Sequence, residues 1–158
     1  DHYQKVGYVS ISPRANESLA TQYIKDLGYK PVLFRAWSDD VLIYHTNVMM
    51  ACTSDHIIVC KEVMDTVGRK AIAETHKDIL EITKEQMDSF AGNMLELESA
   101  SGDPVLVMST RARNSLSAEQ LEILIRTHNL CVLPLDQIES VGGGSARCMI
   151  AENFLPKK

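Results

Sequence analysis

Along the chain, segments in which hydrophobic and polar residues alternate as in a strand are interleaved with segments in which hydrophobic residues recur at helical spacing, which predicts a mixed α/β fold. Residues 6–12 alternate in the manner of a strand, and apolar side chains recur at helical spacing over 19–27. Asn16 is suited to cap this helix at its start and Gly28 to end it. A second strand is expected over 30–37, so the chain opens with a strand, helix, strand unit.

A similar order of elements recurs twice more. We expect the second unit to contain an apolar, β-rich segment, a strand, a helical segment and a final strand, at 41–52, 56–60, 62–76 and 78–83. After a short helix, the third unit is expected to contain two strands, a helix with Ser117 at its N-cap, and a last strand, at 94–99, 104–110, 117–129 and 130–136.

A glycine run and the segment ARCMIAEN (146–153) open a fourth unit, in which we expect a strand carrying Cys148. Strand, strand, helix, strand thus repeats about every fifty residues, a span typical of propeller-like repeats. Equivalent positions in a closed ring of such units would converge near its axis. Because the unit openings carry His45 with Asn47, Asn93 and Cys148, we expect these groups to share one site.

Composition narrows the class of protein. With 158 residues, of which 45% are hydrophobic and 23% charged, the chain is long enough for one globular domain. A net charge of −5 indicates no excess of basic residues of the kind that binds nucleic acid or an anionic membrane surface. Apolar runs are too short to span a bilayer, and no signal-peptide pattern opens the chain.

The four cysteines are widely spaced and form no CxxC motif, so a disulfide framework or a structural zinc site is not expected; they are Cys52, Cys60, Cys131 and Cys148. A reducing, cytoplasmic setting is the prediction. Cys148 is the strongest candidate for chemistry. A thiolate nucleophile needs exposure and nearby positive charge, and the preceding glycines allow a ligand to approach the backbone. An ordinary buried cysteine after a loop is the alternative.

His45 has apolar neighbours on both sides and could be a core histidine. Thr46 and Asn47 add two more polar groups to what we expect to be a buried strand, where unpaired polar groups are costly. A histidine beside a thiol can serve as general acid and base near neutral pH. Asn93 follows Gly92 at a strand entrance, where a turn-forming asparagine is also common.

Arg14, in SPRAN, is either a surface charge or a clamp for a carboxylate. The remaining histidines of the central and C-terminal parts fall in a turn and at helix ends. We expect them to be solvated, and none is spaced for a metal; they are His56, His76 and His128.

Four segments together are specific enough to suggest a family: YHTNVMM (44–50), FAGNMLEL (90–97), VMSTRA (107–112) and GGGSARCM (142–149). The chain resembles the guanidino-group-modifying enzymes, or penteins, over nearly its whole length. Within them it is most similar to the citrulline-utilisation hydrolase branch of the amidinotransferase-related proteins. Arginine deiminases and dimethylarginine hydrolases share a looser form of the pattern. The resemblance implies a pentein α/β propeller of ββαβ repeats, with about three of its five modules here.

By this resemblance, residues 1–158 are the C-terminal portion of a single catalytic domain, with Cys148 as nucleophile and His45 as general acid/base. Arg14 would grip a substrate α-carboxylate, Asn93 would face the central cavity, and Gly143 and Gly144 would make room for substrate. No cofactor or metal is implied. The expected activity is hydrolysis of a linear C–N bond in a ureido or guanidino substrate through a covalent cysteine intermediate. The alternatives are an arginine deiminase, an amidinotransferase, or a non-catalytic propeller fragment that acts as a binding module.

Asn47 departs from the deiminase pattern, which has an acidic residue two positions after the histidine. An amide suits a neutral ureido group, whereas a carboxylate favours a cation, so a citrulline-like substrate is the hypothesis. Relatives also have further modules upstream, with an acidic residue that binds the substrate nitrogens. The expected partners are therefore a small amino-acid substrate and either a second copy of the chain or the missing N-terminal part, with no nucleic acid and no membrane.

Overall fold

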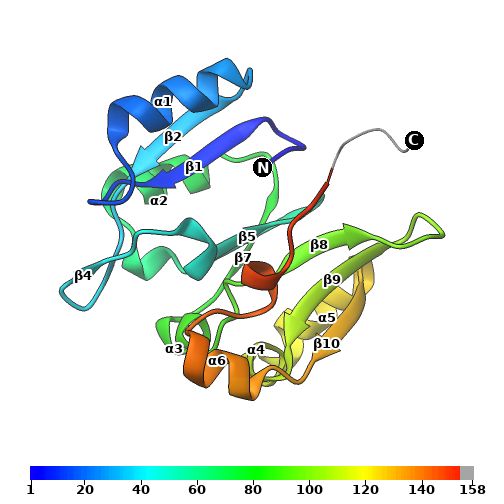
Figure 1. The fold of residues 1–158 in the computed structure, drawn as a ribbon. Coiled ribbons are helices and arrows are strands. Elements are labelled where there is room, and N and C mark those ends of the chain that lie inside the picture. The colour runs from blue at the N-terminus through cyan, green and yellow to red at the C-terminus, as the bar shows by residue number, and fades with distance from the viewer. Residues whose placement is uncertain (154–158) are drawn as a thin grey trace.

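The computed structural model describes residues 1–153, which form small sheets joined by helices (Figure 1). Strands β1 (Val6–Ser10) and β2 (Lys30–Phe34) pair in parallel, with helix α1 (Glu17–Asp26) between them. The Asn16 side chain accepts a hydrogen bond from the Leu19 amide, so it is the predicted N-cap. Gly28 follows the helix with a φ of 74°, which a glycine adopts without steric cost.

The second unit contains a three-stranded sheet in the order β5-β6-β7. Strand β5 (Met50–Cys52) is antiparallel to β6 (His56–Val59), and β6 is parallel to β7 (Asp78–Glu81). A parallel pair needs a crossover connection, which the 3-10 turn η2 (Lys61–Val63) and helix α2 (Thr66–Ala73) supply.

The third unit repeats this plan in the order β8-β9-β10. Helix α3 (Lys84–Asp88) leads into antiparallel β8 (Leu95–Glu98) and β9 (Pro104–Ser109). Two helices, α4 (Thr110–Ser115) and α5 (Ala118–Thr127), then form the crossover. They lead to β10 (Asn129–Leu133), which pairs in parallel with β9. Ser117 caps α5 in a capping box with Gln120. Both units therefore confirm the predicted ββαβ repeat.

One hydrophobic core runs through all three units and fixes how they face one another. It combines Phe34 from the first unit with Ile57 and Ile58 from the second and Leu106 and Leu124 from the third, each 3% exposed or less. Strands β5 and β8, each at one end of its sheet, contact each other. Their N-terminal ends are thereby held side by side, which is where the candidate residues lie.

The segment 41–52 is not the single strand expected from its apolar composition. The chain forms a short hairpin of β3 (Trp37–Ser38) and β4 (Val41–Leu42), then the 3-10 turn η1 (Thr46–Val48), and only then β5. The polar run His45 to Asn47 explains the break, because unpaired polar groups are costly in a buried strand. In the turn His45 is exposed, while the half-buried Thr46 donates its hydroxyl to the Tyr8 carbonyl (3.4 Å).

Two helices were also not expected. Helix α4 starts inside the expected strand 104–110, because Ser109 turns the chain and caps the helix with its hydroxyl. Helix α6 (Asp136–Gly142) includes the first glycine of the run, and Leu135 at its N-cap makes no side-chain capping bond that could announce it. Cys148 lies in the 3-10 turn η3 (Ala146–Met149) rather than in a strand, so that expectation was wrong.

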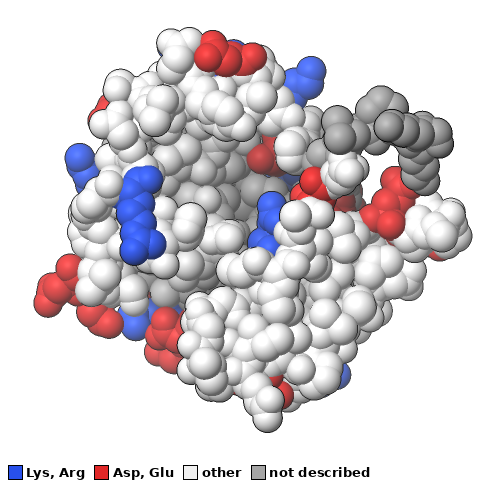
Figure 2. All heavy atoms as spheres, in the orientation of Figure 1, with Lys and Arg blue, Asp and Glu red and all other residues white. Residues whose placement is uncertain are grey.

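The face shown in Figure 2 is hollowed between the first and third units, and its charged side chains are scattered rather than gathered in one patch. Among the helices of residues 1–153, none has both the length and the apolar character needed to cross a bilayer.

Candidate functional site

Cys148 is exposed on η3, at the end of a turn that the glycines shape. Gly143 ends α6 in the left-handed region, with a φ of 68°. At Gly144 a Cβ would lie 3.1 Å from the Cys148 Cβ, closer than ordinary van der Waals contact. The Cys148 amide donates to the Ser145 carbonyl (3.0 Å). The glycines therefore let the chain fold back tightly under an exposed thiol, which excludes the buried-cysteine alternative.

Asn93 holds this thiol from the neighbouring unit. Its side chain is buried, and its Nδ2 lies 3.3 Å from the Cys148 sulfur and donates to the Asn47 carbonyl at 2.8 Å. Its Oδ1 accepts from the Arg147 amide (3.1 Å). One carboxamide thus connects the turn before β5, the start of β8 and the cysteine turn.

Asn47 completes a three-residue cluster, with its Nδ2 3.9 Å from the Cys148 sulfur. Gly92 makes this cluster possible, because a Cβ there would lie 2.5 Å from the Val48 carbonyl oxygen. Only a glycine permits such a close approach of backbone to backbone. The predicted convergence of Asn47, Asn93 and Cys148 is therefore present in the structure.

His45 lies on the same turn but in a different set of contacts. Its side chain is exposed, so the structure contradicts the alternative of a core histidine. The imidazole packs on the Tyr44 ring with centroids 4.6 Å apart, and the Arg14 guanidinium lies 4.4 Å from the centroid of the same ring. Within residues 1–153 His45 forms no hydrogen bond with Cys148. Tyr44 was not predicted, although its position directly before the histidine placed it in the YHTN motif.

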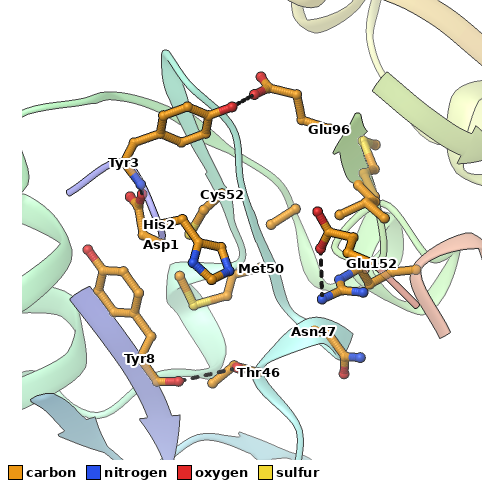
Figure 3. A pocket seen from close by; sticks show the side chains of 14 residues that line it. Asp1, His2, Tyr3, Tyr8, Thr46, Asn47, Met50, Cys52, Glu96 and Glu152 are labelled. Atoms are coloured by element: carbon orange, nitrogen blue, oxygen red, sulfur yellow. Dashed lines mark hydrogen bonds and ion pairs between the residues drawn. The ribbon is translucent and has the colours of Figure 1, made fainter. Parts of the chain in front are cut away.

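A cavity of about 240 Å³ adjoins the cluster (Figure 3). Asn47 and Arg147 line it beside the cysteine turn, and Cys52 and Glu96 line it deeper in the molecule. Figure 3 shows Tyr3 reaching across to Glu96, and Glu152 in an ion pair with an arginine, which is Arg147 at 3.8 Å.

Glu96 is the most heavily bonded group of the cavity. It accepts hydrogen bonds from the Tyr3 hydroxyl (2.5 Å), from the Ser54 amide and hydroxyl (both 2.9 Å) and from His128 Nε2 (2.6 Å). Burial alone would raise the pKa of Glu96, but these hydrogen bonds outweigh it and lower the pKa below its usual value. The bond to Glu96 also raises the pKa of Tyr3 to about 12.

The surroundings of Glu96 correct the expectation that the histidines are solvated. His128 and His56 are both buried, and their rings lie 6.4 Å apart, whereas His76 is exposed as expected. A buried carboxylate partner explains His128, since a polar ring needs a hydrogen bond inside a protein. Glu96 was not predicted because its partners lie far away in the sequence. In the described part of the chain, no group of three or more His, Cys, Asp or Glu side chains is placed to hold a metal ion.

Comparison with known proteins places this arrangement in a family. The family model for eukaryotic N,N dimethylarginine dimethylhydrolase matches residues 1–155, nearly the entire chain. The chain belongs to this family. The match confirms the resemblance to the guanidino-modifying pentein superfamily, which the dimethylarginine dimethylhydrolases share with the citrulline-utilisation branch. Comparison with curated protein sequences gives no significant match.

Solved structures support the fold of this dimethylarginine dimethylhydrolase family member. The apo form of ArgZ, an arginine dihydrolase of the ornithine-ammonia cycle in Cyanobacteria, superposes with a TM-score of 0.72 at 16% identity over 95% of the chain. The product-bound N-terminal domain of ArgZ gives 0.69 at 14% identity over 90% of the chain. AgrE in complex with ornithine and NAD⁺ gives 0.64, also at 14% identity and over 90% of the chain.

The chain spans only part of each of these proteins: 23% of apo ArgZ, 48% of its N-terminal domain and 19% of AgrE. At such low identity the likeness establishes the fold alone, and that fold agrees with the α/β architecture that the family resemblance implies.

Proposed function

We propose that this chain carries the nucleophile and the acid/base group of a cysteine-dependent hydrolase that cleaves a linear C–N bond of a ureido or guanidino substrate. The observation that carries the proposal is the exposed Cys148 thiol held by the side chains of Asn93 (3.3 Å) and Asn47 (3.9 Å). A scaffold protein has no need of a thiol that is both exposed and oriented by two carboxamides.

In the proposed reaction the Cys148 thiolate attacks the central carbon of the substrate group, which forms an S–C bond. His45 donates a proton to the departing nitrogen, the C–N bond breaks, and an amine leaves. His45 then takes a proton from water, the resulting hydroxide attacks the same carbon, and the S–C bond breaks to restore the thiolate. The net reaction consumes one water. Catalytic hydrogen bonds often form only with substrate present, so the lack of a His45–Cys148 hydrogen bond within residues 1–153 does not exclude this role.

Asn47 favours a neutral, citrulline-like substrate over arginine. Its carboxamide can donate to the oxygen of a ureido group and accept from its NH₂, whereas nothing in an amide neutralises a guanidinium. The acidic side chains that line the adjoining cavity are already engaged, since Asp1 pairs with Lys77, Glu96 with His128 and Glu152 with Arg147. Arg14 is proposed to bind the substrate α-carboxylate.

Assays of the full-length protein with citrulline, arginine and dimethylarginine test the substrate proposal. We expect citrulline to be turned over fastest and Asn47→Asp to shift the preference toward arginine, while Cys148→Ser abolishes turnover of all three. Faster wild-type turnover of arginine would contradict the citrulline assignment. It would favour the deiminase alternative, in line with the arginine dihydrolase activity named for ArgZ.

A second measurement separates the enzyme from a non-catalytic binding module. We expect Cys148 to be alkylated by iodoacetamide faster than a model thiol at pH 7, because a catalytic thiol has enhanced thiolate character. A rate equal to that of the model thiol would favour the binding module. We also retain two predictions: a cytoplasmic location, and completion of the site by a second copy or by additional modules.

A further inference from the structure

Glu139 is a buried carboxylic acid beneath the cysteine turn that the proposed chemistry does not use. It lies in α6 and is 4% exposed. Its Oε1 accepts a hydrogen bond from the Ser145 hydroxyl at 2.6 Å, and Ser145 is fully buried. Its Oε2 is buried and has no hydrogen-bond partner within residues 1–153. The Ser145 hydroxyl is thus the single side-chain partner of this carboxyl group among the described residues.

This pair holds both ends of the glycine turn. The Glu139 carbonyl accepts from the Gly143 amide (3.2 Å), where α6 ends. The Ser145 carbonyl accepts from the Cys148 amide (3.0 Å), where η3 begins. Glu139 therefore holds Ser145, the residue from which the cysteine turn starts, whereas Asn93 accepts from the amide of Arg147 within that turn.

The energetics argue against a stabilising role for Glu139. A buried carboxyl group with half of its acceptor capacity unused has lost hydration without full compensation. Replacement of both partners of such a buried pair by apolar side chains is often neutral or stabilising. A group that stability alone does not explain, and that is bonded to the frame of an exposed thiol, points to a positioning function.

We propose that Glu139 is a positioning residue for Cys148. Glu139 acts through the Ser145 hydroxyl to fix the direction of the Cys148 thiol toward substrate. The proposal rests on the proposed function, in which the Cys148 sulfur must approach the substrate carbon along a defined direction. Asn93 fixes the thiol from the neighbouring unit, and Glu139 fixes the backbone turn behind it. Small misplacements of a reacting atom are costly, of order a hundredfold in rate for a shift of about 1 Å.

The test compares variants of the full-length protein that separate stability from thiol position. Glu139→Gln keeps an acceptor for Ser145. Ser145→Ala leaves the carboxyl group without a partner, and Glu139→Met combined with Ser145→Ala replaces the pair by apolar groups. Thr53→Val is the matched control, because it also removes a fully buried hydroxyl with hydrogen bonds, on the loop between β5 and β6. Alkylation of Cys148, followed on its own peptide across pH, is measured with kcat, KM and the thermal midpoint.

The double variant is expected to unfold near the wild-type temperature, yet to lose about tenfold or more in Cys148 alkylation and in kcat, with little change in KM. Glu139→Gln is expected to stay near wild type. Thr53→Val is expected to unfold at a lower temperature without any loss of alkylation rate. If the double variant fails to fold, the Cys148 alkylation rates of Ser145→Ala and Thr53→Val are compared instead. Only Ser145→Ala is expected to slow alkylation.

Two results would overturn the proposal in distinguishable ways. If wild-type Cys148 reacts faster than a model thiol, and the double variant matches the wild type in alkylation rate and kcat, the positioning role alone is contradicted. A wild-type Cys148 that reacts no faster than a model thiol would contradict the proposed function, and the positioning role with it.

Discussion

Asn93 shows how much one buried side chain can determine. Its carboxamide donates a hydrogen bond to the Asn47 carbonyl and accepts one from the Arg147 amide, and its Nδ2 lies 3.3 Å from the Cys148 sulfur. A residue with several partners in different segments couples the positions of those segments. The geometry of the thiol is therefore tied to the junction between the second and third units.

Replacing Asn93 by alanine removes all of these contacts at once. We expect about 1–3 kcal/mol of destabilisation, because the Asn47 carbonyl loses its partner and the Arg147 amide keeps only its longer bond (3.4 Å) to the backbone carbonyl of residue 93. We also expect a fall in kcat of about a hundredfold. Urea unfolding and steady-state kinetics provide the two numbers. Asn114→Ala is the control, since this exposed asparagine accepts a side-chain hydrogen bond from its neighbour Arg113 and has no part in the site. Wild-type kcat in Asn93→Ala would refute a role at the thiol.

Between elements, the decisive contact is the one that Gly92 allows between the loop before β8 and the turn η1. Helix α6 offers the contrasting case, since Gly142 has nothing within 4 Å of its would-be Cβ. The two glycines therefore differ in what a methyl group would meet, although both precede a residue of the site.

Gly92→Ala is expected to destabilise the protein by about 1–3 kcal/mol or more, because backbone cannot move aside as a side chain does. It should also slow Cys148 alkylation, since the turn that carries Asn47 is displaced. Gly142→Ala should be neutral or stabilising by up to about 1 kcal/mol, as expected for a helical position. Thermal unfolding of both variants checks the pair, and equal effects would show that the close approach is unimportant.

The elements that could be predicted from sequence are those with local signals. The helices that Asn16 and Ser117 cap, and the ββαβ order, follow from periodicity and capping chemistry. Helix α6 was missed because it has no side-chain cap. The shared location of Cys148 and Asn93 followed from the repeat, whereas Glu139 and Glu96 could not be found, since the sequence does not show which hydroxyl or ring meets a buried carboxyl group.

For the whole molecule, Glu96 is the group that joins all three units. Tyr3 belongs to the first unit, Ser54 to the second, and His128 with Glu96 to the third. Because the folded pKa of Glu96 lies below that of an unfolded chain, about 4.3, its charged form stabilises the fold above that value. The contribution is lost as the pH falls through the folded pKa.

We therefore expect Glu96→Gln to lower the free energy of unfolding at pH 7, and the difference from wild type to shrink as the pH falls below 4. Urea titrations at pH 7, 5, 4 and 3 measure this. Glu122→Gln is the control, since Glu122 forms an exposed pair with Arg126 on α5 and should change stability little at any pH. A difference that stays constant down to pH 3 would show that the charge of Glu96 does not matter.

The same carboxylate has a consequence for the order in which the chain folds. Its partners Tyr3, Ser54 and His128 are 93, 42 and 32 positions away in the sequence, whereas the hairpin of β8 and β9 closes locally. Closing long loops costs entropy before any contact is gained. The hairpins should therefore be formed in the transition state while the Glu96 bonds are still absent, so that loss of this carboxylate accelerates unfolding and leaves the folding rate nearly unchanged.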